Sequence, residues 1–375
     1  MAAPADASKF GPDRRLDAST PPEGRRRGRG ATANPASRFE AARREAFREE
    51  DGAAAWEADD PAPLRTEVTP ERSARIIARN TSPDIPFDRS INPYRGCEHG
   101  CIYCYARPTH AYLGLSPGLD FESRIFAKPE AARLLVRELA APGYRPDTIA
   151  LGTATDPYQP VERDHRITRA VLEVLHDARH PVAITTKSDL VLRDLDLLAE
   201  MAAQDLVLVA LSLPTLDPAL ARRLDPRAPR PDKRLAAMAR LSAAGVPVMV
   251  NVSPIIPGLT DHEIEAILAR ARAHGASRIG HALLRLPGEV ADLMADWFVE
   301  HYPERKDRAF ALLRQARGGR ENDSRFGHRF RGEGAYAEMI GARVRLAGTR
   351  LGFAFGRMPL NRAAFRKPGA QLALF

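Results

Sequence analysis

The three cysteines are the residues of this chain with the clearest capacity for chemistry. Cys97, Cys101 and Cys104 are its only cysteines and stand in C-x3-C-x2-C spacing. A structural zinc site normally has four protein ligands, and a disulfide would leave one thiol unpaired. Three thiolates suit a cubane iron–sulfur cluster whose fourth iron awaits another ligand. The spacing therefore predicts a [4Fe–4S] cluster with one open coordination position.

A zinc site completed by His99 or His110, or a fortuitous group of thiols, is the alternative. His99 lies inside the loop that the cysteines must wrap. A histidine there is poorly placed to complete a tetrahedron. The spacing and the number of thiols favour the cubane.

An aromatic residue, Tyr103, stands immediately before the last cysteine. With it, the segment Cys97–Cys104 resembles the signature of the radical S-adenosylmethionine (radical SAM) enzymes. The resemblance implies a [4Fe–4S] cluster, S-adenosylmethionine (SAM) as the second cofactor, and a partial (β/α)6 barrel.

The pattern of apolar residues also predicts an α/β fold, because short apolar runs alternate with amphipathic stretches as in parallel βα units. The predicted strands are Ser90–Tyr94, Thr148–Thr155, Pro181–Lys187, Leu206–Leu213, Val246–Pro254 and Arg278–Leu286. The predicted helices between them are Thr168–Arg179, Leu192–Ala203, Lys233–Ala244 and Asp261–His274. Six units close only part of a TIM-like barrel, and chemistry is expected at the C-terminal ends of its strands.

Composition divides the chain into four parts. Residues 1–60 are rich in Ala, Pro, Gly and Arg and predict a largely disordered arm, with a short helical pattern over Phe39–Trp56. Residues 61–300 hold the predicted radical SAM core. Residues 301–366 predict a basic helical extension with helices over Ala309–Arg317 and Gly334–Leu351, and residues 367–375 a flexible tail.

Two predicted strand ends carry polar groups suited to a nucleoside cofactor. After the second strand, Thr155 and Asp156 are suited to grip amino and ribose groups; a turn that caps the next helix is the alternative for Asp156. The third strand ends at Lys187, whose ammonium needs an anion. A methionyl carboxylate would serve.

Two later strand ends add further candidates. The fourth strand ends in Ser212. The fifth ends in the run Asn251–Asp261, in which Asn251 and Ser253 are predicted cofactor-binding residues. Ile255 and its neighbour Ile256 are suited to flank an adenine ring or to be ordinary core residues.

Together these segments narrow the resemblance to the spore photoproduct lyase-like branch of the superfamily, also described as DNA-repair photolyase-like, over roughly residues 85–290. It implies that Thr155, Lys187 and Ser212 contact polar groups of SAM. It also implies that the backbone around Tyr103 and Ile255 lines the adenine.

The same resemblance implies an enzyme whose reduced cluster cleaves bound SAM to a 5′-deoxyadenosyl radical that abstracts hydrogen from the substrate. An electron donor is an expected partner. Tyr103 and Tyr105 match tyrosines of the lyase, which leaves open a tyrosine relay, with Tyr105 as a packing aromatic being the alternative. The lyase's hydrogen-donating cysteine is replaced here by Thr153, whose O–H bond is too strong for that role.

Positive charge is concentrated at the C-terminal end. The net charge is +3 over residues 1–50, −5 over 51–300 and +10 over 301–375. Arg and Phe are interleaved in the flexible loop Arg317–Phe326, which suits phosphate contacts and base stacking or simply a solvated surface. The leading hypothesis is a radical SAM enzyme acting on nucleic acid, through DNA repair or base modification, with a small metabolite or a protein side chain as alternative substrates.

The last five residues, Gln371–Phe375, resemble the peptide by which bacterial repair proteins dock onto the DNA sliding clamp. They support a third hypothesis, a non-catalytic iron–sulfur protein that docks to the clamp. A terminal strand packed on the barrel is the structural alternative. The N-terminus, Met1–Arg29, is polar and Arg-rich, and no run reaches the length of a membrane span, so the expected location is the cytoplasm without membrane contact.

Overall fold

The computed structural model describes residues 28–39 and 64–369, and its centre is a sheet of six parallel strands. In spatial order these are β10 (Arg278–Leu283), β9 (Val248–Ile255), β8 (Val207–Ser212), β7 (Val182–Thr186), β6 (Ile149–Leu151) and β3 (Arg89–Ile91), with a short antiparallel strand, β2 (Ala78–Arg79), at the β3 edge. Each of these six strands lies beside the one of the six that precedes it in the chain. This order confirms the predicted partial (β/α)6 barrel.

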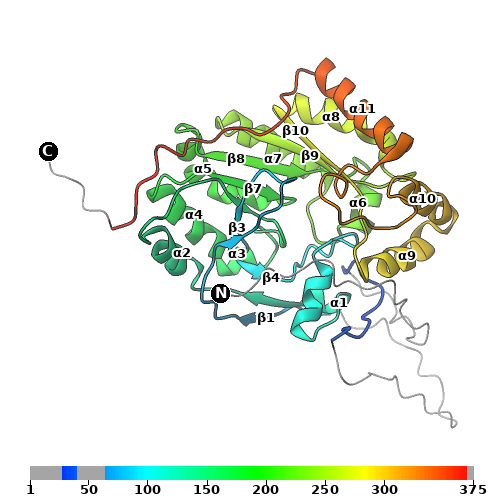
Figure 1. Ribbon diagram of the computed structural model, residues 1–375, viewed down its shortest axis with the longest axis horizontal. Helices are drawn as coiled ribbons and strands as arrows, with labels where there is room; N and C mark the ends of the chain where they lie inside the picture. The colour runs from blue at the N-terminus through cyan, green and yellow to red at the C-terminus, as the bar shows by residue number, and fades with distance from the viewer. Residues whose placement is uncertain (1–27, 40–63, 370–375) are drawn as a thin grey trace, which may run out of the picture.

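Helices cover the outer face of this sheet (Figure 1). They are α2 (Ala131–Leu139), α4 (Ile167–Asp177), α5 (Leu195–Ala202), α7 (Pro231–Ala243), α8 (Ile264–Ala273) and α11 (Gly334–Arg350), with the short α3 (Glu162–His165) before α4. In α4, Val171, Leu172 and Leu175 are buried on one helical face. They join a single core with alternate strand residues such as Val250 and Val252 of β9. No helix in the described segments is both long and apolar enough to cross a bilayer.

A second, three-stranded sheet corrects the first predicted strand. It consists of β1 (Glu67–Pro70), β5 (Arg124–Ala127) and β4 (Tyr94–Arg95), with α1 (Leu119–Ser123) just before β5. The predicted strand Ser90–Tyr94 is therefore split: β3 ends at Ile91, and Tyr94 pairs in the other sheet.

The predicted strand Thr148–Thr155 is also too long, because β6 ends at Leu151. The chain turns at Gly152, which has a φ of +86°, and a Cβ at this position would lie 2.1 Å from the Thr185 carbonyl oxygen. Glycine alone permits this close turn. The polar residues that follow Gly152 therefore form a loop at the barrel mouth.

Part of the predicted disordered arm is packed on the core. Residues 28–39, here called the strap, lie against the loop that carries Cys97–Cys104, called the cluster loop or cysteine loop below. Arg29 and Ala31 of the strap are buried. Arg29 donates to the carbonyl of Leu64 at 2.7 Å and to that of Glu122 at 2.5 Å. The expected helical pattern lies almost wholly in residues 40–63, outside the described residues.

The expected boundary near residue 300 is bridged by a second hydrophobic core. It joins α6 (Pro218–Leu224), α9 (Val290–His301) and α10 (Pro303–Gln315) to the cysteine loop. Trp297 of α9, Phe310 of α10 and Ile102 of the loop are among its members. The first part of the basic extension is thus structurally continuous with the barrel.

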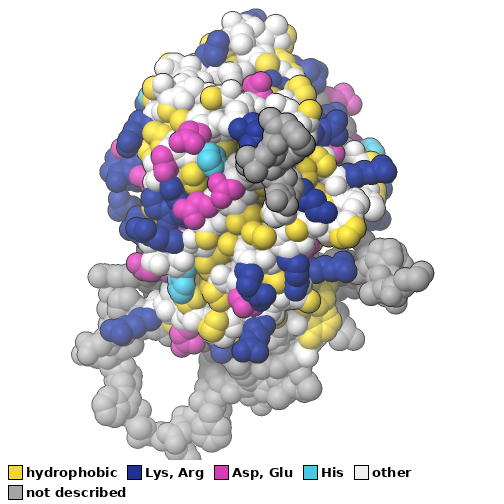
Figure 2. All heavy atoms as spheres, turned by 90° about the vertical axis from the view of Figure 1, so that its left-hand side faces the viewer, with side chains coloured by type: hydrophobic (Ala, Val, Ile, Leu, Met, Phe, Trp, Pro, Cys, Tyr) yellow, Lys and Arg dark blue, Asp and Glu magenta, His cyan; other side chains and the backbone are white. Residues whose placement is uncertain are grey.

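The last described segment, residues 352–369, runs across the end of the barrel opposite the cysteines. Ala354 pairs with Arg278 at the start of β10, and the Asn361 amide donates to Asp205 just before β8. The Arg366 amide donates to Ala178, before β7. On the face shown in Figure 2, Lys and Arg side chains are interspersed with Asp and Glu. Gln371–Phe375 lie outside the described residues.

His180 gives a pH-dependent prediction at this end of the barrel. Its ring is fully buried, with Nε2 2.8 Å from the Tyr144 hydroxyl and Nδ1 3.0 Å from the Pro181 carbonyl oxygen. Burial lowers the pKa of His180 to about 4. The unfolded chain, with a histidine pKa of about 6.5, takes up the proton first as the pH falls.

The contribution of neutral His180 to stability is therefore complete above about pH 6.5 and is lost as the pH falls towards 4. Between pH 7 and pH 5 the expected loss is about 2 kcal/mol from this group. Urea unfolding at both pH values checks it, since His180→Gln should remove that part of the pH dependence. Equal pH dependence in the two proteins would contradict the prediction.

Candidate cluster and cofactor site

The three cysteines lie on one loop at the mouth of the barrel, directly after β4. Cys97 and Cys101 are buried and Cys104 is half-buried. Burial raises the pKa of the Cys97 and Cys101 thiols well above the ordinary value. Because thiolates are the metal-binding form, these buried thiols ionise only beside a strongly positive group. Their burial fits residues that hold a metal centre.

The cysteine thiols do not form the close group of ligands that a single zinc ion requires. Around one zinc, tetrahedral thiolates lie about 3.8 Å from one another. Among the described residues, the three cysteines do not form a group whose ligating atoms all lie within 4.8 Å of one another, alone or with His99 or His110. His110 instead donates from Nε2 to the Arg124 carbonyl at 2.9 Å. The geometry disfavours the zinc alternative.

Two buried side chains hold the cysteine loop in shape. Arg107 donates to the carbonyls of Cys101 at 2.9 Å and Gly100 at 3.1 Å. Gln159 accepts from the Glu98 amide at 2.9 Å and donates to the Gly96 carbonyl at 3.2 Å. Sequence reasoning missed both residues, although Gln159 stands in the polar run after β6 and Arg107 three residues after Cys104.

Glu122 joins the strap to the same loop. Its carboxylate accepts from Arg107 at 2.5 Å and from the amides of Gly30 and Ala31 at 2.8 Å each. A Cβ on Gly30 would lie 1.8 Å from the Gly100 carbonyl oxygen. The strap therefore packs against the cluster loop at a point where only glycine fits.

Gly30→Val is expected to separate the strap from the cluster loop. Overpacking of this kind costs about 1–3 kcal/mol, and here the strain falls on the segment that positions the cysteines. We expect less iron per chain after anaerobic reconstitution, measured against Gly341→Ala in α11. Equal iron content in both variants would show that the strap does not support the cluster.

Lys187 directly follows β7 at the barrel mouth. Its Nζ lies 5.7 Å from the Tyr103 ring centroid and has no hydrogen-bond acceptor among the described residues. Burial alone would lower the pKa of Lys187, but Cys101, Asp225 and Asp156 outweigh it and raise that pKa. The ammonium is therefore charged and available to an anionic ligand.

Tyr103 is held by a buried network that the sequence did not reveal. Its hydroxyl donates to Asp225, which also accepts from Arg234 at 2.9 Å. Arg234 is 1% exposed and donates to the carbonyl of Ser212 at 3.0 Å. The network fixes Tyr103 and the end of β8 relative to each other. Neither Asp225 nor Arg234 stands in a motif that could have indicated this role.

The carboxylate of Asp156 is engaged by the protein. It accepts from the Tyr158 amide at 2.9 Å, from the Thr186 hydroxyl at 2.6 Å and from the Lys187 amide at 2.8 Å. Burial would raise the pKa of Asp156, but His99, Thr186 and Lys187 hold it at about 2. The Tyr158 contact is the turn that the sequence left as the alternative. Asp156 thus fixes the backbone of Lys187 rather than offering a vacant acceptor to a cofactor.

The remaining predicted cofactor residues lie on or near the same strand ends. The Thr155 hydroxyl is buried and donates to the Tyr94 carbonyl at 3.2 Å. Ser212 pairs in register with Asn251. Asn251 and Ser253 are half-buried and share the β9 face opposite to the core residues. Ile255 is 1% exposed and is part of the hydrophobic core, which matches its core alternative.

Tyr105 lies between the cysteine loop and the loop after β6. Its side chain is 45% exposed, and its hydroxyl donates to the backbone carbonyl of Thr153. The Thr153 hydroxyl itself lies 3.1–3.3 Å from the Asn92 side-chain amide. The structure thus brings together Tyr105 and the position where the lyase resemblance calls for a cysteine.

A loop after α10, residues 318–333, reaches the same mouth. The Leu283 amide at the end of β10 donates to its Phe330 carbonyl at 2.9 Å. Arg329 pairs with Asp84 at 2.6 Å, so the loop connects the last strand to the segment before β3. Arg329 also stacks on Phe326 at 5.0 Å and on Phe330 at 4.8 Å from the ring centroids.

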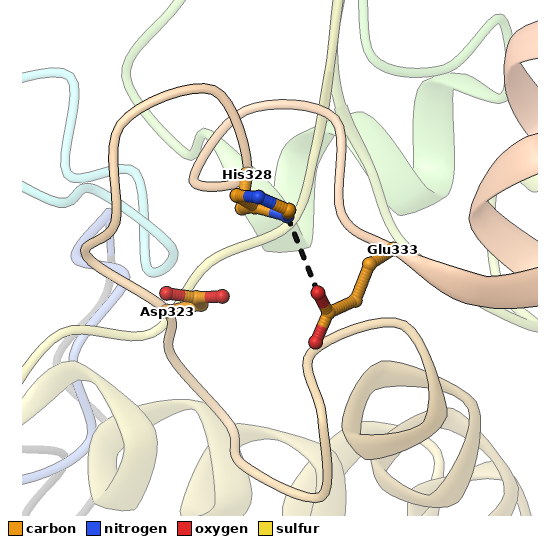
Figure 3. A group of neighbouring side chains, drawn as sticks. All are labelled: Asp323, His328 and Glu333. Atoms are coloured by element: carbon orange, nitrogen blue, oxygen red, sulfur yellow. Dashed lines mark ion pairs between the residues drawn. The ribbon is translucent and has the colours of Figure 1, made fainter.

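The same loop contains a second group of possible metal ligands. The ligating atoms of Asp323, His328 and Glu333 lie within 4.8 Å of one another (Figure 3). Arg325 already donates to Asp323 at 2.6 Å and to Glu333 at 3.0 Å. Its guanidinium lowers the pKa of Asp323. The Arg325 guanidinium is thus the cation that these carboxylates already bind, and the group stabilises the loop.

Comparison with known proteins gives the family. Residues 91–271 match the model of the radical SAM superfamily. Uncharacterized proteins of Mycobacterium bovis and Mycobacterium tuberculosis are 39% identical over 233 residues, which is 62% of this chain and 68% of each relative. An uncharacterized protein of Methanocaldococcus jannaschii is 32% identical over 46% of this chain and 62% of its own.

Solved structures of spore photoproduct lyase share the fold. A variant with bound AdoMet and dinucleoside spore photoproduct has a TM-score of 0.55 and 14% identity over 78% of this chain and 82% of the lyase. The family match covers the barrel from the end of β3 into α8, including the cysteine loop. The chain therefore belongs to the radical SAM superfamily, and its cofactors are a [4Fe–4S] cluster and SAM.

Proposed function

We propose that this radical SAM enzyme acts on nucleic acid, as a repair or base-modifying enzyme. Cys97, Cys101 and Cys104 hold the cluster in this proposal, and Lys187 binds the SAM carboxylate. When bound, the cluster and SAM supply reductive cleavage of a C–S bond and a radical that abstracts hydrogen. The chain contributes orientation, burial and the binding of the substrate.

The observation that carries the nucleic-acid assignment is the position of the 318–333 loop. It contains four arginines against three acidic residues, and it lies at the end of the barrel that holds the cysteines. Its Phe326 is 56% exposed, and Arg329 stacks on it. Exposed aromatic rings between arginines suit stacked bases and phosphates. The fold shared with spore photoproduct lyase supports the same assignment.

The absence of a fourth cysteine from this sequence shapes the proposed reaction. Thr153 stands beside Tyr105, and its hydroxyl is not a useful hydrogen-atom donor. We therefore propose that the reaction ends without a thiol, with Tyr105 as a candidate exposed phenol on the cysteine loop. Spore photoproduct repair by a cysteine route does not fit this chain.

Anaerobic turnover tests the proposed substrate class. The reconstituted, reduced enzyme is incubated with SAM and with undamaged DNA, UV-irradiated DNA or RNA, and 5′-deoxyadenosine is measured by mass spectrometry. We expect at least one nucleic acid to stimulate its formation and to be altered in mass. Cleavage of SAM that no nucleic acid changes would contradict the assignment and favour a small metabolite or a protein side chain.

The two proposed protein partners are an electron donor and the DNA sliding clamp. The electron donor must reduce the cluster. Docking to the sliding clamp through Gln371–Phe375 remains a prediction from the sequence. The preceding described segment leaves the barrel at the end opposite the cysteines, so such docking would not obstruct the mouth.

A further inference from the structure

Arg285 is a guanidinium at the barrel mouth with which no carboxylate forms an ion pair in the part of the chain that the structure describes. It follows β10 by two residues, and its Nε is buried with no hydrogen-bond partner. Its terminal nitrogens have no hydrogen-bond acceptor among the described residues. An unpaired buried polar group of this kind is costly, and more so when it is charged.

The protein nevertheless holds Arg285 firmly in place. The Leu284 amide donates to Ile255 at 2.9 Å, and the Leu284 carbonyl accepts from the buried Arg317 Nε at 2.9 Å. The guanidinium carbon lies 4.7 Å from the Tyr105 ring centroid and 5.5 Å from that of Phe330. Arg285 is therefore fixed between an aromatic ring of the cluster loop and one of the 318–333 loop.

Two other arginines, Arg317 and Arg329, repel it. Burial lowers the pKa of Arg317 to about 10, and repulsion from Arg285 adds to this effect. Burial likewise lowers the pKa of Arg285, and Arg329 contributes in the same direction, whereas Tyr105 and Asp84 act against it. The Asp84 carboxylate is already paired with Arg329. An anion from outside the chain would relieve this repulsion.

We propose that Arg285 binds a phosphodiester of the nucleic-acid substrate and thereby places the adjacent nucleotide beside Tyr105 at the cluster loop. The proposal rests on the proposed function and names the contact that aligns its substrate. A phosphate meets the planar donor fork of an arginine with two hydrogen bonds. The exposed part of the Tyr105 ring and exposed Phe326 give neighbouring bases surfaces on which to stack. This series of faces suits a strand better than a single small anion.

The test measures binding and does not depend on turnover. A fluorescein-labelled single-stranded deoxyoligonucleotide of about 12 nucleotides is titrated with the cluster-loaded enzyme at several salt concentrations. Arg285→Gln should weaken binding about tenfold and reduce the slope of log Kd against log salt by about 0.7, the value for one lost phosphate contact. Arg285→Lys should keep the slope but bind more weakly, because lysine lacks the planar fork.

Arg133→Gln is the matched control. It removes the same charge from an exposed position on α2, away from the barrel mouth, so binding should change by less than about twofold. Binding by Arg285→Gln equal to that of the wild type would overturn the inference while leaving the proposed function intact. If Arg285→Gln does not fold, Arg285→Lys decides, because wild-type affinity in that variant would equally overturn it.

Failure of the wild-type enzyme to bind any oligonucleotide at low salt is a different outcome. It would remove the proposed nucleic-acid function, and with it the phosphodiester. A parallel titration with thymidine monophosphate then distinguishes the sources of phosphate. Arg285-dependent binding of the mononucleotide alone would assign the site to a small phosphorylated substrate and overturn the proposal as stated.

Discussion

Cys104→Ala is expected to abolish both the cluster and SAM cleavage. Cys104 is the half-buried thiol of the three, and the chain has no other cysteine to replace it. Iron and sulfide should fall to background after anaerobic reconstitution. Reductive formation of 5′-deoxyadenosine should fall by roughly 10³-fold or more, as when an indispensable catalytic group is removed.

A substitution of His110 provides the control for this prediction. His110→Gln should retain iron, because His110 is engaged with the Arg124 carbonyl and belongs to no group of metal ligands with the cysteines. Metal retained as zinc in Cys104→Ala, and lost in His110→Gln, would contradict the cluster and restore the zinc alternative.

Lys187→Met is expected to weaken SAM binding while leaving the cluster in place. The ammonium is charged, lies beside Tyr103 and has no hydrogen-bond acceptor among the residues that the structure describes. A hydrogen bond to a charged group contributes about 1.5–3 kcal/mol, so Kd for SAM should rise roughly 10- to 150-fold. Anaerobic calorimetry with the cluster-loaded protein measures it.

Lys233→Met is the matched control, because Lys233 is exposed on α7 and outside the mouth. It should bind SAM with the wild-type affinity. Iron content separates loss of SAM binding from loss of structure in both variants. Unchanged SAM affinity in Lys187→Met at full iron content would mean that another residue receives the carboxylate.

The sequence was sufficient to predict the barrel and the cluster loop. The alternation of apolar runs and amphipathic stretches is a local pattern, and it located β7, β8 and β9 and the helices between them. The cysteine spacing is local too. Lys187 could be placed at the mouth because the carboxyl ends of parallel strands meet at one end of a barrel.

The contacts that shape the site could not be predicted, because they join residues far apart in the chain. Glu122 accepts from Gly30 and Ala31, more than 90 residues earlier. Asp225 accepts from Tyr103, 122 residues away. Polar residues such as these carry no periodic signal, and their roles appear only once the chain is folded. The composition of the strap likewise predicted disorder, whereas burial of Arg29 and Ala31 orders it.

The spatial distribution of charge at the basic C-terminal end also could not be predicted from the sequence. A net charge of +10 over residues 301–375 predicted one phosphate-binding surface. The structure divides that charge, because the 318–333 loop lies at the mouth while residues 352–369 cross the opposite end, where Arg357 and Arg362 pair with Asp147. Net charge gives no information on which end of the barrel each arginine occupies. The arginines relevant to a substrate at the cluster are therefore those of the mouth.

Hydrogen transfer from nucleic acid is the most direct test of the proposal that this radical SAM enzyme acts on nucleic acid. The reduced enzyme is given unlabelled SAM and DNA with deuterium in its nucleosides, and 5′-deoxyadenosine is analysed by mass spectrometry. We predict deuterium in the 5′-deoxyadenosine with labelled DNA and none with unlabelled DNA. Unlabelled 5′-deoxyadenosine formed at the same rate with and without DNA would contradict the account.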